Sequence, residues 1–283
     1  GNKACVDCHP REAGQLNTPM AQALEVAPDC KILTARGRLT FKNGNYSYEI
    51  ARQGKTITYT VSDGTNSISK PILYCFGQGH IGQTYVFRNN DVFYETRVSY
   101  FQKLRELDFT IGHRTNVPAS LDDALGRAIV GDEPQQCFGC HTTGAVNGLE
   151  LKLDRLRPGI ECEACHGPGE NHLVAMKEKK VDEPQIFNPG GLGAFELTQS
   201  FCGTCHTSFE QAMLLPGQSG INNIRFQPYR MFNSRGHNTN DPRVSCLACH
   251  NPHEHLKQDA AYYDAKCLAC HLTTAKEAKT ERR

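Results

Sequence analysis

Six copies of one pattern, Cys-x-x-Cys-His, constrain this chain more than any other feature of its sequence. A shuffled chain of 283 residues with its 14 cysteines and 12 histidines would contain only about 0.03 such patterns. The pattern is the attachment site of a c-type haem, because two thiols bond to one edge of the porphyrin and the adjacent imidazole ligates the iron. The motif cysteines are Cys5 and Cys8, Cys137 and Cys140, Cys162 and Cys165, Cys202 and Cys205, Cys246 and Cys249, and Cys267 and Cys270. The histidines that follow them are His9, His141, His166, His206, His250 and His271.

Other cysteine-rich designs explain the pattern less well. Disulfide scaffolds, zinc knuckles and thioredoxin-like pairs do not require a histidine directly after the second cysteine in all six cases. The sequence therefore predicts six covalently attached haem c groups. Haem attachment takes place outside the cytoplasm in bacteria, so we expect an exported protein, extracellular or at the cell surface, or alternatively periplasmic. No signal peptide precedes the first motif, as expected of a cleaved, mature chain.

Charge and hydropathy exclude two classes of function. Thirty-one Lys and Arg residues balance thirty Asp and Glu residues, which leaves a formal net charge of +1 and gives no basis for nucleic-acid binding. No stretch approaches the roughly 18 apolar residues that a membrane-spanning helix requires. We therefore expect neither a nucleic-acid partner nor a membrane span.

The motifs are unevenly distributed along the chain. One lies at the N-terminus, none lies between residues 10 and 136, and five lie within 137–271. This spacing predicts an N-terminal haem segment over 1–37, a haem-free β-meander with helices over 38–130, and a haem-dense domain over 131–283. The expected fold is a mostly irregular and α-helical multihaem cytochrome wrapped around stacked haems. In this fold the antiparallel β-meander is an insertion, and the content of regular secondary structure is low (α+β).

The middle of the chain has the alternation of β-strands. Apolar and polar residues alternate over 39–41, 46–50, 57–61, 84–87 and 92–98. Asn43-Gly44, Asp63-Gly64 and Asn89-Asn90-Asp91 separate these runs and predict hairpin turns. We expect about five strands over 38–99, then helices near 100–108 and 119–130, the second with Ser120 as its N-cap.

Six histidines outside the motifs are candidates for the distal positions on the six irons. They are His80, His113, His172, His237, His253 and His255. His80 and His113 lie in glycine-bearing loops of the haem-free region, which we expect to supply ligands rather than to act as a spacer. His172 follows a tight Gly-Pro-Gly turn, His253 lies three residues after the fifth motif histidine, and His237 precedes that motif.

Several strings resemble the multihaem cytochromes related to the tetrahaem electron carrier of nitrifying bacteria. They are Cys140-His141-Thr142-Thr143-Gly144, the run from Gly159 to His172, and Cys249-His250-Asn251-Pro252-His253. The resemblance covers residues 1–25 and 137–271. In those relatives a Ser-x-His-x-x-Ala pattern after the first motif supplies a distal histidine, and this chain has Met20 at that histidine position. Because a thioether also ligates haem iron, the resemblance implies Met20 as a distal ligand and leaves His255 in reserve. Ordinary packing of Met20 is the alternative.

Two cysteines, Cys30 and Cys75, lie outside every motif. In an exported protein they are a possible disulfide. The alternative is a pair of buried thiols packed beside haem edges.

These features predict an electron-transfer protein rather than an enzyme. Saturated axial ligation leaves an iron no position for substrate, and close haems allow electrons to pass between them. We expect a polymerising extracellular conduit, a head-to-tail filament, that serves redox partner proteins or extracellular electron acceptors. A discrete monomeric shuttle is the alternative, and an oxidoreductase with one open catalytic haem is a second alternative.

Overall fold

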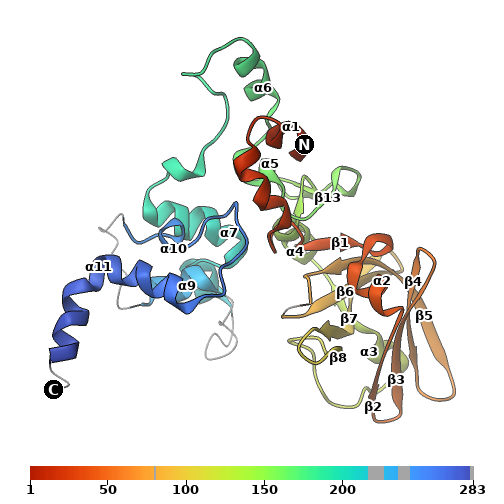
Figure 1. The fold of residues 1–283 in the computed structure, drawn as a ribbon. Helices are drawn as coiled ribbons and strands as arrows, with labels where there is room; N and C mark the ends of the chain where they lie inside the picture. Colours follow the sequence, from red (N-terminus) through yellow and green to blue (C-terminus); the bar gives the residue numbers. More distant parts are fainter. Residues whose placement is uncertain (80, 216–225, 235–242, 281–283) are drawn as a thin grey trace. The chain divides into compact units, whose positions relative to one another are not determined.

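The computed structural model describes residues 1–79, 81–215, 226–234 and 243–280 (Figure 1). The chain forms two compact units, one of Pro19–Ala164 and the other of Gly1–Thr18 together with Cys165–Arg283. We call them the β-rich unit and the haem-motif unit. The sequence predicts three consecutive segments over 1–37, 38–130 and 131–283. In the structure, residues 1–18 form a compact unit together with residues 165–283.

One antiparallel sheet dominates the β-rich unit. Its main path runs in chain order from β2 to β8, while β1 pairs with β5 and β9 pairs with β7. Only neighbouring strands along the chain pair on the main path, so hairpins make most of the connections. The strands are β1 (Leu24–Val26), β2 (Arg38–Asn43), β3 (Tyr46–Gln53), β4 (Thr56–Ser62), β5 (Ser67–Phe76), β6 (Gln83–Asn89), β7 (Val92–Phe101), β8 (Glu106–Phe109) and β9 (Gly126–Ile129). Short two-stranded pairs join β10 (Thr142–Thr143) to β13 (Arg157–Pro158) and β11 (Val146–Asn147) to β12 (Glu150–Leu151).

The sheet curves until its first and last strands approach each other. The rings of Phe41 on β2 and Phe109 on β8 meet edge to face with centroids 5.1 Å apart. Inside the curve lies a core in which Tyr48, Tyr59 and Tyr100 are almost completely buried. The helices α2 (Lys31–Arg36) and α3 (Leu121–Leu125) contribute Leu33 and Leu125 to the same core. The apolar residues that alternate along each strand therefore lie on one face of the sheet and are buried in this core.

The expected fold class is wrong, because the structure is rich in β-strand. The alternation predicts strands only over 38–99, as an insertion, whereas the sheet also includes residues 24–26, 106–109 and 126–129. Near-closure explains this recruitment, since added strands cover the edges and the interior of a curved sheet. A mainly helical and irregular wrapping is therefore not the architecture of this chain.

Some of the strands, turns and helices predicted for this region are present in the structure, and others are not. All five expected strands and the three hairpin turns are present, with positive φ at Gly44, Gly64 and Asn90. Strand β5 was missed because Pro71 and several polar residues interrupt its alternation. The expected helix at 100–108 is wrong, because β7 continues to Phe101 and β8 follows. The second helix begins at the expected N-cap, where Asp123 N–H donates to Ser120 Oγ, but it ends at Leu125.

The haem-motif unit is built from short helices. They are α1 (Asn2–Val6), the 3₁₀ helix η1 (Pro10–Asn17), α6 (Glu170–Lys177), η4 (Pro189–Gly191), the π-helix η5 (Glu196–Cys202), α7 (Gly203–His206), α8 (Phe209–Leu214), α9 (Gln227–Phe232), α10 (Cys246–Cys249) and α11 (Ala260–Thr280), which kinks at His271. The helix α5 (Cys162–His166) lies at the junction of the two units, and α4 (Glu133–His141) belongs to the β-rich unit. Among the described residues, α1, α5 and α10 bury none of their side chains. No helix in the described ranges has the length and apolarity needed to cross a membrane.

Candidate haem-ligand site

The described motifs lie on or beside short helical segments. The second motif ends α4, the third forms α5, and the fourth runs from the end of η5 through α7. The fifth forms α10 with His250 as its C-cap, and the sixth lies in α11. One helical turn places residues three apart on the same face, so both cysteines of a motif point toward one porphyrin edge. The adjacent histidine then lies beside that edge.

Two imidazoles face each other at the first motif. The ring of His9 lies 6.2 Å, centroid to centroid, from the ring of His172 on α6, and the ring planes are inclined by 22°. His172 follows the Gly-Pro-Gly turn, as the sequence analysis proposed for a distal ligand. The structure thus brings together a motif histidine and a candidate distal histidine that are far apart in the chain.

A second pair forms at the third motif. His166 at the end of α5 faces His253, with centroids 6.0 Å apart and planes inclined by 14°. His253 lies in the turn after the fifth motif, where its N–H donates to the side-chain oxygen of Asn251 at 3.0 Å. The distal candidate that follows one motif therefore faces the histidine of another.

In both pairs, the distance between the two ring centroids is the distance expected for two imidazoles bound to one iron. Each metal–imidazole bond is about 2.0 Å and each ring centroid lies about 1.1 Å beyond the bonded nitrogen, so two rings on one metal have centroids about 6 Å apart. Rings in direct face-to-face contact would be much closer. Four residues of this unit thus fit two bis-histidine haems.

The hydrogen bonds of these rings also favour ligation of iron through Nε2. His172 Nδ1 lies 2.6 Å from Pro184 O, His166 Nδ1 lies 3.0 Å from Phe187 O, and His253 Nδ1 lies 2.8 Å from Glu12 Oε2. A carbonyl or carboxylate oxygen only accepts, so each Nδ1 donates and the lone pair of the neutral ring is on Nε2. Metal-ligating histidines characteristically donate their other ring nitrogen to such acceptors.

The second motif is held within the β-rich unit. His141 Nδ1 donates to Ala23 O at 2.9 Å, and burial lowers the pKa of this imidazole. Burial likewise raises the pKa of Cys137 to about 11, with Glu95 and Glu133 adding to the effect. The ring of His141 is therefore neutral and presents Nε2, as a proximal ligand requires.

Met20 lies on the same turn as Ala23. Its carbonyl accepts from Ile160 N–H at 3.0 Å, just before the third motif. Gly159 makes this approach possible, because its φ is +76° and an added Cβ would lie 1.9 Å from Ala21 O. Met20 belongs to the β-rich unit, whereas His9 belongs to the haem-motif unit. A ligand role for Met20 stays a prediction.

The fourth and fifth motifs meet inside the haem-motif unit. The side chains of Cys202 and Cys246, the first cysteines of these two motifs, are within hydrogen-bonding contact. Aromatic rings pack beside them, with Phe209 and Phe232 centroids 4.2 Å apart. Gln199 ties this cluster together, because its amide donates to Pro228 O and its carbonyl accepts from Phe209 N–H, both at 2.9 Å. Contact between the two cysteines brings their attachment sites side by side.

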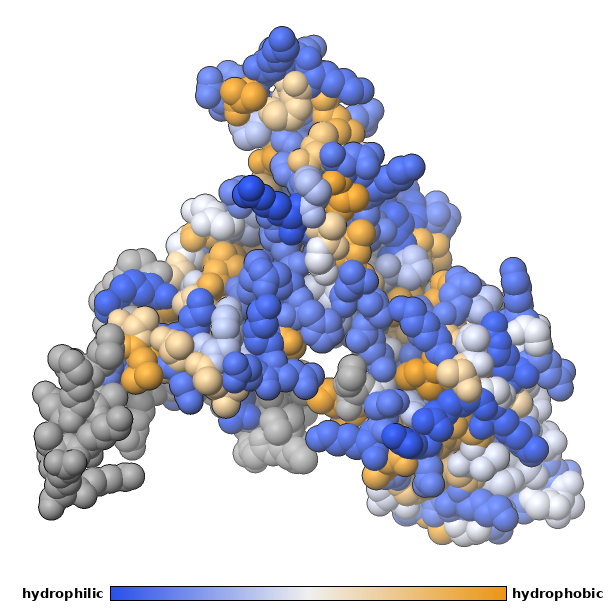
Figure 2. Space-filling view, viewed as in Figure 1, coloured by the Kyte–Doolittle hydropathy of each residue, from blue (hydrophilic) through white to orange (hydrophobic). Residues whose placement is uncertain are grey.

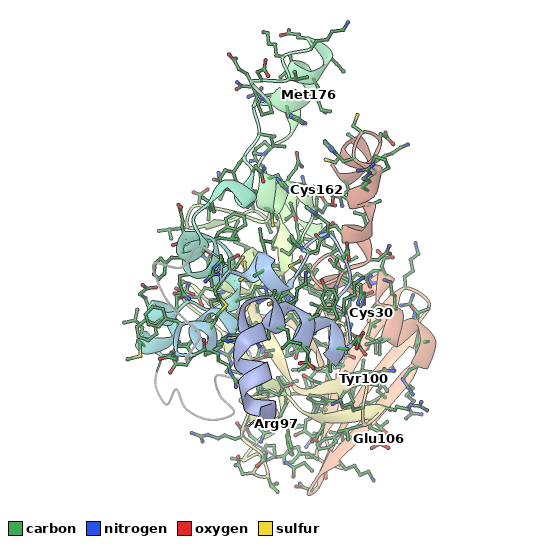
Figure 3. The ribbon with its side chains drawn as sticks, turned by 60° about the vertical axis from the view of Figure 1, so that its left-hand side comes forward. Cys30, Arg97, Tyr100, Glu106, Cys162 and Met176 are labelled. Atoms are coloured by element: carbon green, nitrogen blue, oxygen red, sulfur yellow. The ribbon has the colours of Figure 1, made fainter. Side chains whose placement is uncertain are left out.

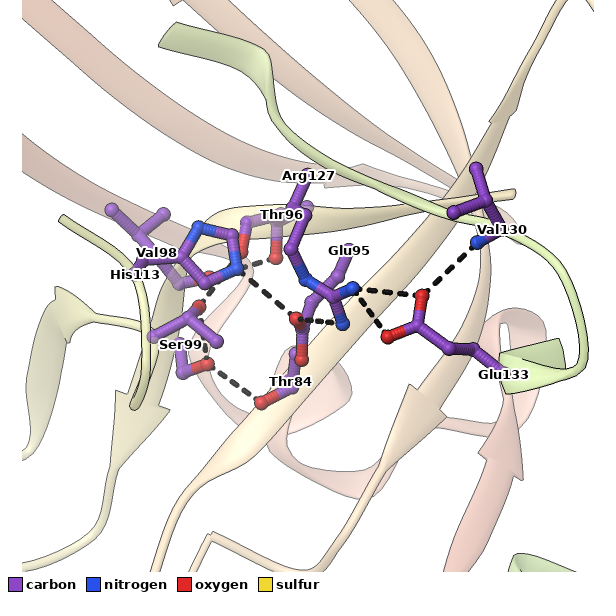
Figure 4. Close-up of polar contacts among 10 residues, drawn as sticks. Thr84, Glu95, Thr96, Val98, Ser99, His113, Arg127, Val130 and Glu133 are labelled. Atoms are coloured by element: carbon purple, nitrogen blue, oxygen red, sulfur yellow. Dashed lines mark hydrogen bonds and ion pairs between the residues drawn. The ribbon is translucent and has the colours of Figure 1, made fainter. Parts of the chain in front are cut away.

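His113 has a different environment from the paired histidines. Its side chain is 6% exposed, and Nε2, the atom that would face an iron, lies 3.0 Å from Glu95 Oε2 (Figure 4). Arg127 bridges Glu95 to Glu133 on α4. The structure thus engages this predicted ligand in a polar network on β7 and β9, and its ligand role stays a prediction.

The other candidates complete the set. His255 is exposed and its Nδ1 lies 3.3 Å from Leu256 O. His250 packs against Tyr263, with centroids 5.5 Å apart. His80 and His237 lie outside the described residues, and so does the side chain of Cys270.

Cys30 and Cys75 belong to the same core cluster of the β-rich unit, and Cys30 is labelled in Figure 3. Both are completely buried, and Cys30 Sγ donates to Gln83 Oε1 at 3.2 Å. The hydrogen bond with Cys30 and burial raise the pKa of the Cys75 thiol. The structure brings the two cysteines into contact, and a disulfide between them stays a prediction.

Sequence reasoning missed the groups that orient the imidazoles. Glu12 and the backbone carbonyls of Pro184 and Phe187 hold His253, His172 and His166. Carbonyls carry no residue signature, and Glu12 stands only three residues after His9 without a recognisable motif. Apolar side chains near His172 were missed as well. Leu173 and Val174 on α6 are exposed and offer the kind of surface that a porphyrin face contacts. Figure 2 shows hydrophobic residues at the surface of the part of the molecule where Figure 1 labels α6.

Comparison with known proteins gives one match, to a family of c-type cytochromes. The family model described as cytochrome c554 and c-prime matches residues 98–167, from the end of β7 through the third motif. The match overlaps the expected range of resemblance at 137–167 and lies almost entirely within the β-rich unit. It supports a c-type cytochrome with covalently bound haem c that transfers electrons. No curated protein and no solved structure matches the chain significantly.

Proposed function

We propose that this chain is an exported hexahaem c-type cytochrome that transfers electrons between closely spaced haems and does not act as an enzyme. The two facing imidazole pairs, His9 with His172 and His166 with His253, carry this proposal. Each pair fits both axial positions of one iron. An iron held in this way exchanges electrons but offers no position for substrate.

Different residues of the chain hold the haem and ligate its iron. Bound haem supplies an iron that takes up and releases one electron. The motif cysteines hold the group covalently, and the paired imidazoles fix its axis. The α5 to α6 turn carries both His166 and His172, so one short segment serves two pairs. This shared segment supports a close and fixed spacing between the first and third sites.

Electrons need accessible motifs to enter and leave. Cys205 of the fourth motif is exposed within the haem-motif unit, and so are Cys8 of the first motif and Cys267 of the sixth, the motifs at the two ends of the series. We propose these two motifs as the exchange points, either toward a second copy in a head-to-tail filament or toward a soluble redox partner. A heterologous contact of this kind produces open filaments rather than closed dimers. Electron microscopy of the purified native protein distinguishes the two, because only the filament gives extended particles.

Haem content is the first test. We expect pyridine haemochrome and intact mass to report six covalent haems per chain. A Cys205→Ala variant, which removes one thioether, should change the haemochrome spectrum of one haem in six. A count below six in the wild-type protein would contradict the proposal.

The paired ligands give the second test. His172→Ala should convert one low-spin haem to a high-spin form in electron paramagnetic resonance, because one iron loses an axial imidazole. His253→Ala should do the same to a different haem. Lys177→Ala, an exposed residue on the same helix α6 as His172, is the matched control and should leave all low-spin signals in place. Binding of carbon monoxide by the reduced wild-type protein would instead favour an open, catalytic haem.

A further inference from the structure

The 3₁₀ helix η1 after the first motif contacts the turn after the fifth. Glu12 Oε2 lies 2.8 Å from His253 Nδ1. Two residues later, an added Cβ on Gly14 would lie 2.7 Å from the carbonyl oxygen of His253, so only glycine permits this approach. Asn251 holds the His253 N–H from the other side. The side chain and the backbone of this histidine are therefore both held in place.

The partner of Nδ1 differs between the two distal histidines. His172 donates to a neutral backbone carbonyl, that of Pro184, whereas His253 donates to a carboxylate. A carboxylate acceptor makes an imidazole a more electron-rich ligand and fixes the orientation of its ring. A more electron-rich ligand and a nearby negative charge both stabilise the ferric state relative to the ferrous state.

We propose that Glu12 is a positioning residue for His253, and that it makes the iron between His166 and His253 harder to reduce than the iron between His9 and His172. The inference rests on the proposed function, because it takes both pairs as axial ligands of haem iron. Through Glu12, the first motif segment sets the potential of the third haem. The two neighbouring sites then differ in potential, which gives electron flow between them a preferred direction.

The effect should be moderate, because the Glu12 side chain is 47% exposed and that of His253 is 32% exposed. The test compares three variants of the haem-loaded protein. Glu12→Gln keeps a hydrogen-bond acceptor and removes the charge, Glu12→Ala removes both, and Glu210→Gln removes an exposed charge from α8 as the control. Redox titration followed by absorbance and electron paramagnetic resonance reports the potential of each low-spin haem.

For Glu12→Gln we expect one haem to become easier to reduce. At a fixed applied potential, its ratio of reduced to oxidised form should rise about fivefold, with the other haems unchanged. Glu12→Ala should give the same rise and should also broaden the signal of that haem, because the His253 ring is then free to rotate. The affected haem should be the one whose low-spin signal disappears in His253→Ala.

Two results would overturn the proposal. One is a titration of Glu12→Gln that equals that of Glu210→Gln, and the other is a haem that becomes harder to reduce. A second measurement separates the hydrogen bond from the charge. In a His253→Met background, Glu12→Gln should cause a smaller shift of that haem, because only the effect of the charge then remains. Either overturning result with six haems and both bis-histidine pairs still present would leave the proposed function standing. A wild-type protein without bis-histidine haems would instead remove the proposed function itself.

Discussion

In the β-rich unit, side chains of neighbouring strands bury one another, whereas in the haem-motif unit most motif residues stay accessible. Tyr48, Ile50 and Tyr59 are at most 1% exposed. In the haem-motif unit the described buried apolar residues are small in number and scattered, with Ala175, Leu197 and Ala212 among them. The two units therefore differ in how much protein core they have. The β-rich unit has a core of protein side chains, and we propose that covalently held porphyrins supply the apolar surface of the haem-motif unit.

The largest expected effect follows from withholding haem. In cells that lack haem attachment, we expect the haem-motif unit to lose its fold while the β-rich unit keeps its own. Limited proteolysis should then cut within 165–283 and leave a stable fragment over about 19–164. Protease resistance of the whole haem-free chain would show that the haem-motif unit does not need haem for its fold.

A core substitution should act on the β-rich unit alone. Ile50→Ala should lower the free energy of unfolding of this unit by about 3 kcal/mol, because it leaves a cavity beneath the curved sheet. Urea titration followed by tyrosine fluorescence measures the change. Lys55→Ala, in the exposed β3–β4 turn, is the control and should change little. A comparable change in the haem absorbance of the haem-motif unit would show that the two cores are coupled.

The third prediction concerns the cysteine pair in the core of the β-rich unit. We expect Cys30 and Cys75 of the native protein to form a disulfide, so that both resist alkylation under denaturing conditions until a reductant is added. Cys30→Ser should then cost about 2 to 4 kcal/mol of stability in the β-rich unit. Intact mass before and after reduction measures the bond. Prompt alkylation of both thiols without reductant would establish the buried-thiol alternative.

The smallest expected effect concerns His113. Because its Nε2 contacts Glu95, we expect His113→Ala to cost about 1 kcal/mol of stability. The haem spectra should be unchanged. Glu95→Gln should behave in the same way, as the other partner of that contact. Loss of a low-spin haem signal in His113→Ala would restore this residue to the ligand set.

Local chemistry made part of this protein predictable from its sequence. The motifs carry all their information within five residues, and the hairpin turns depend on residues such as Gly44 and Gly64 whose φ is positive. Alternation identified β3, β4, β6 and β7 because each buries one face. Strand β5 escaped detection because its pairing with β4 and β6, rather than its own pattern, holds it in the sheet.

The sequence by itself determined that this chain attaches haem and that candidate distal ligands exist. Only the tertiary structure decided which imidazoles face each other and what orients them. His9 meets His172, and Glu12 meets His253, across segments that are distant in the chain. The physical reason is that an axial ligand needs only a suitable ring at the right distance. Many positions in a histidine-rich chain satisfy that local requirement, and long-range packing selects among them.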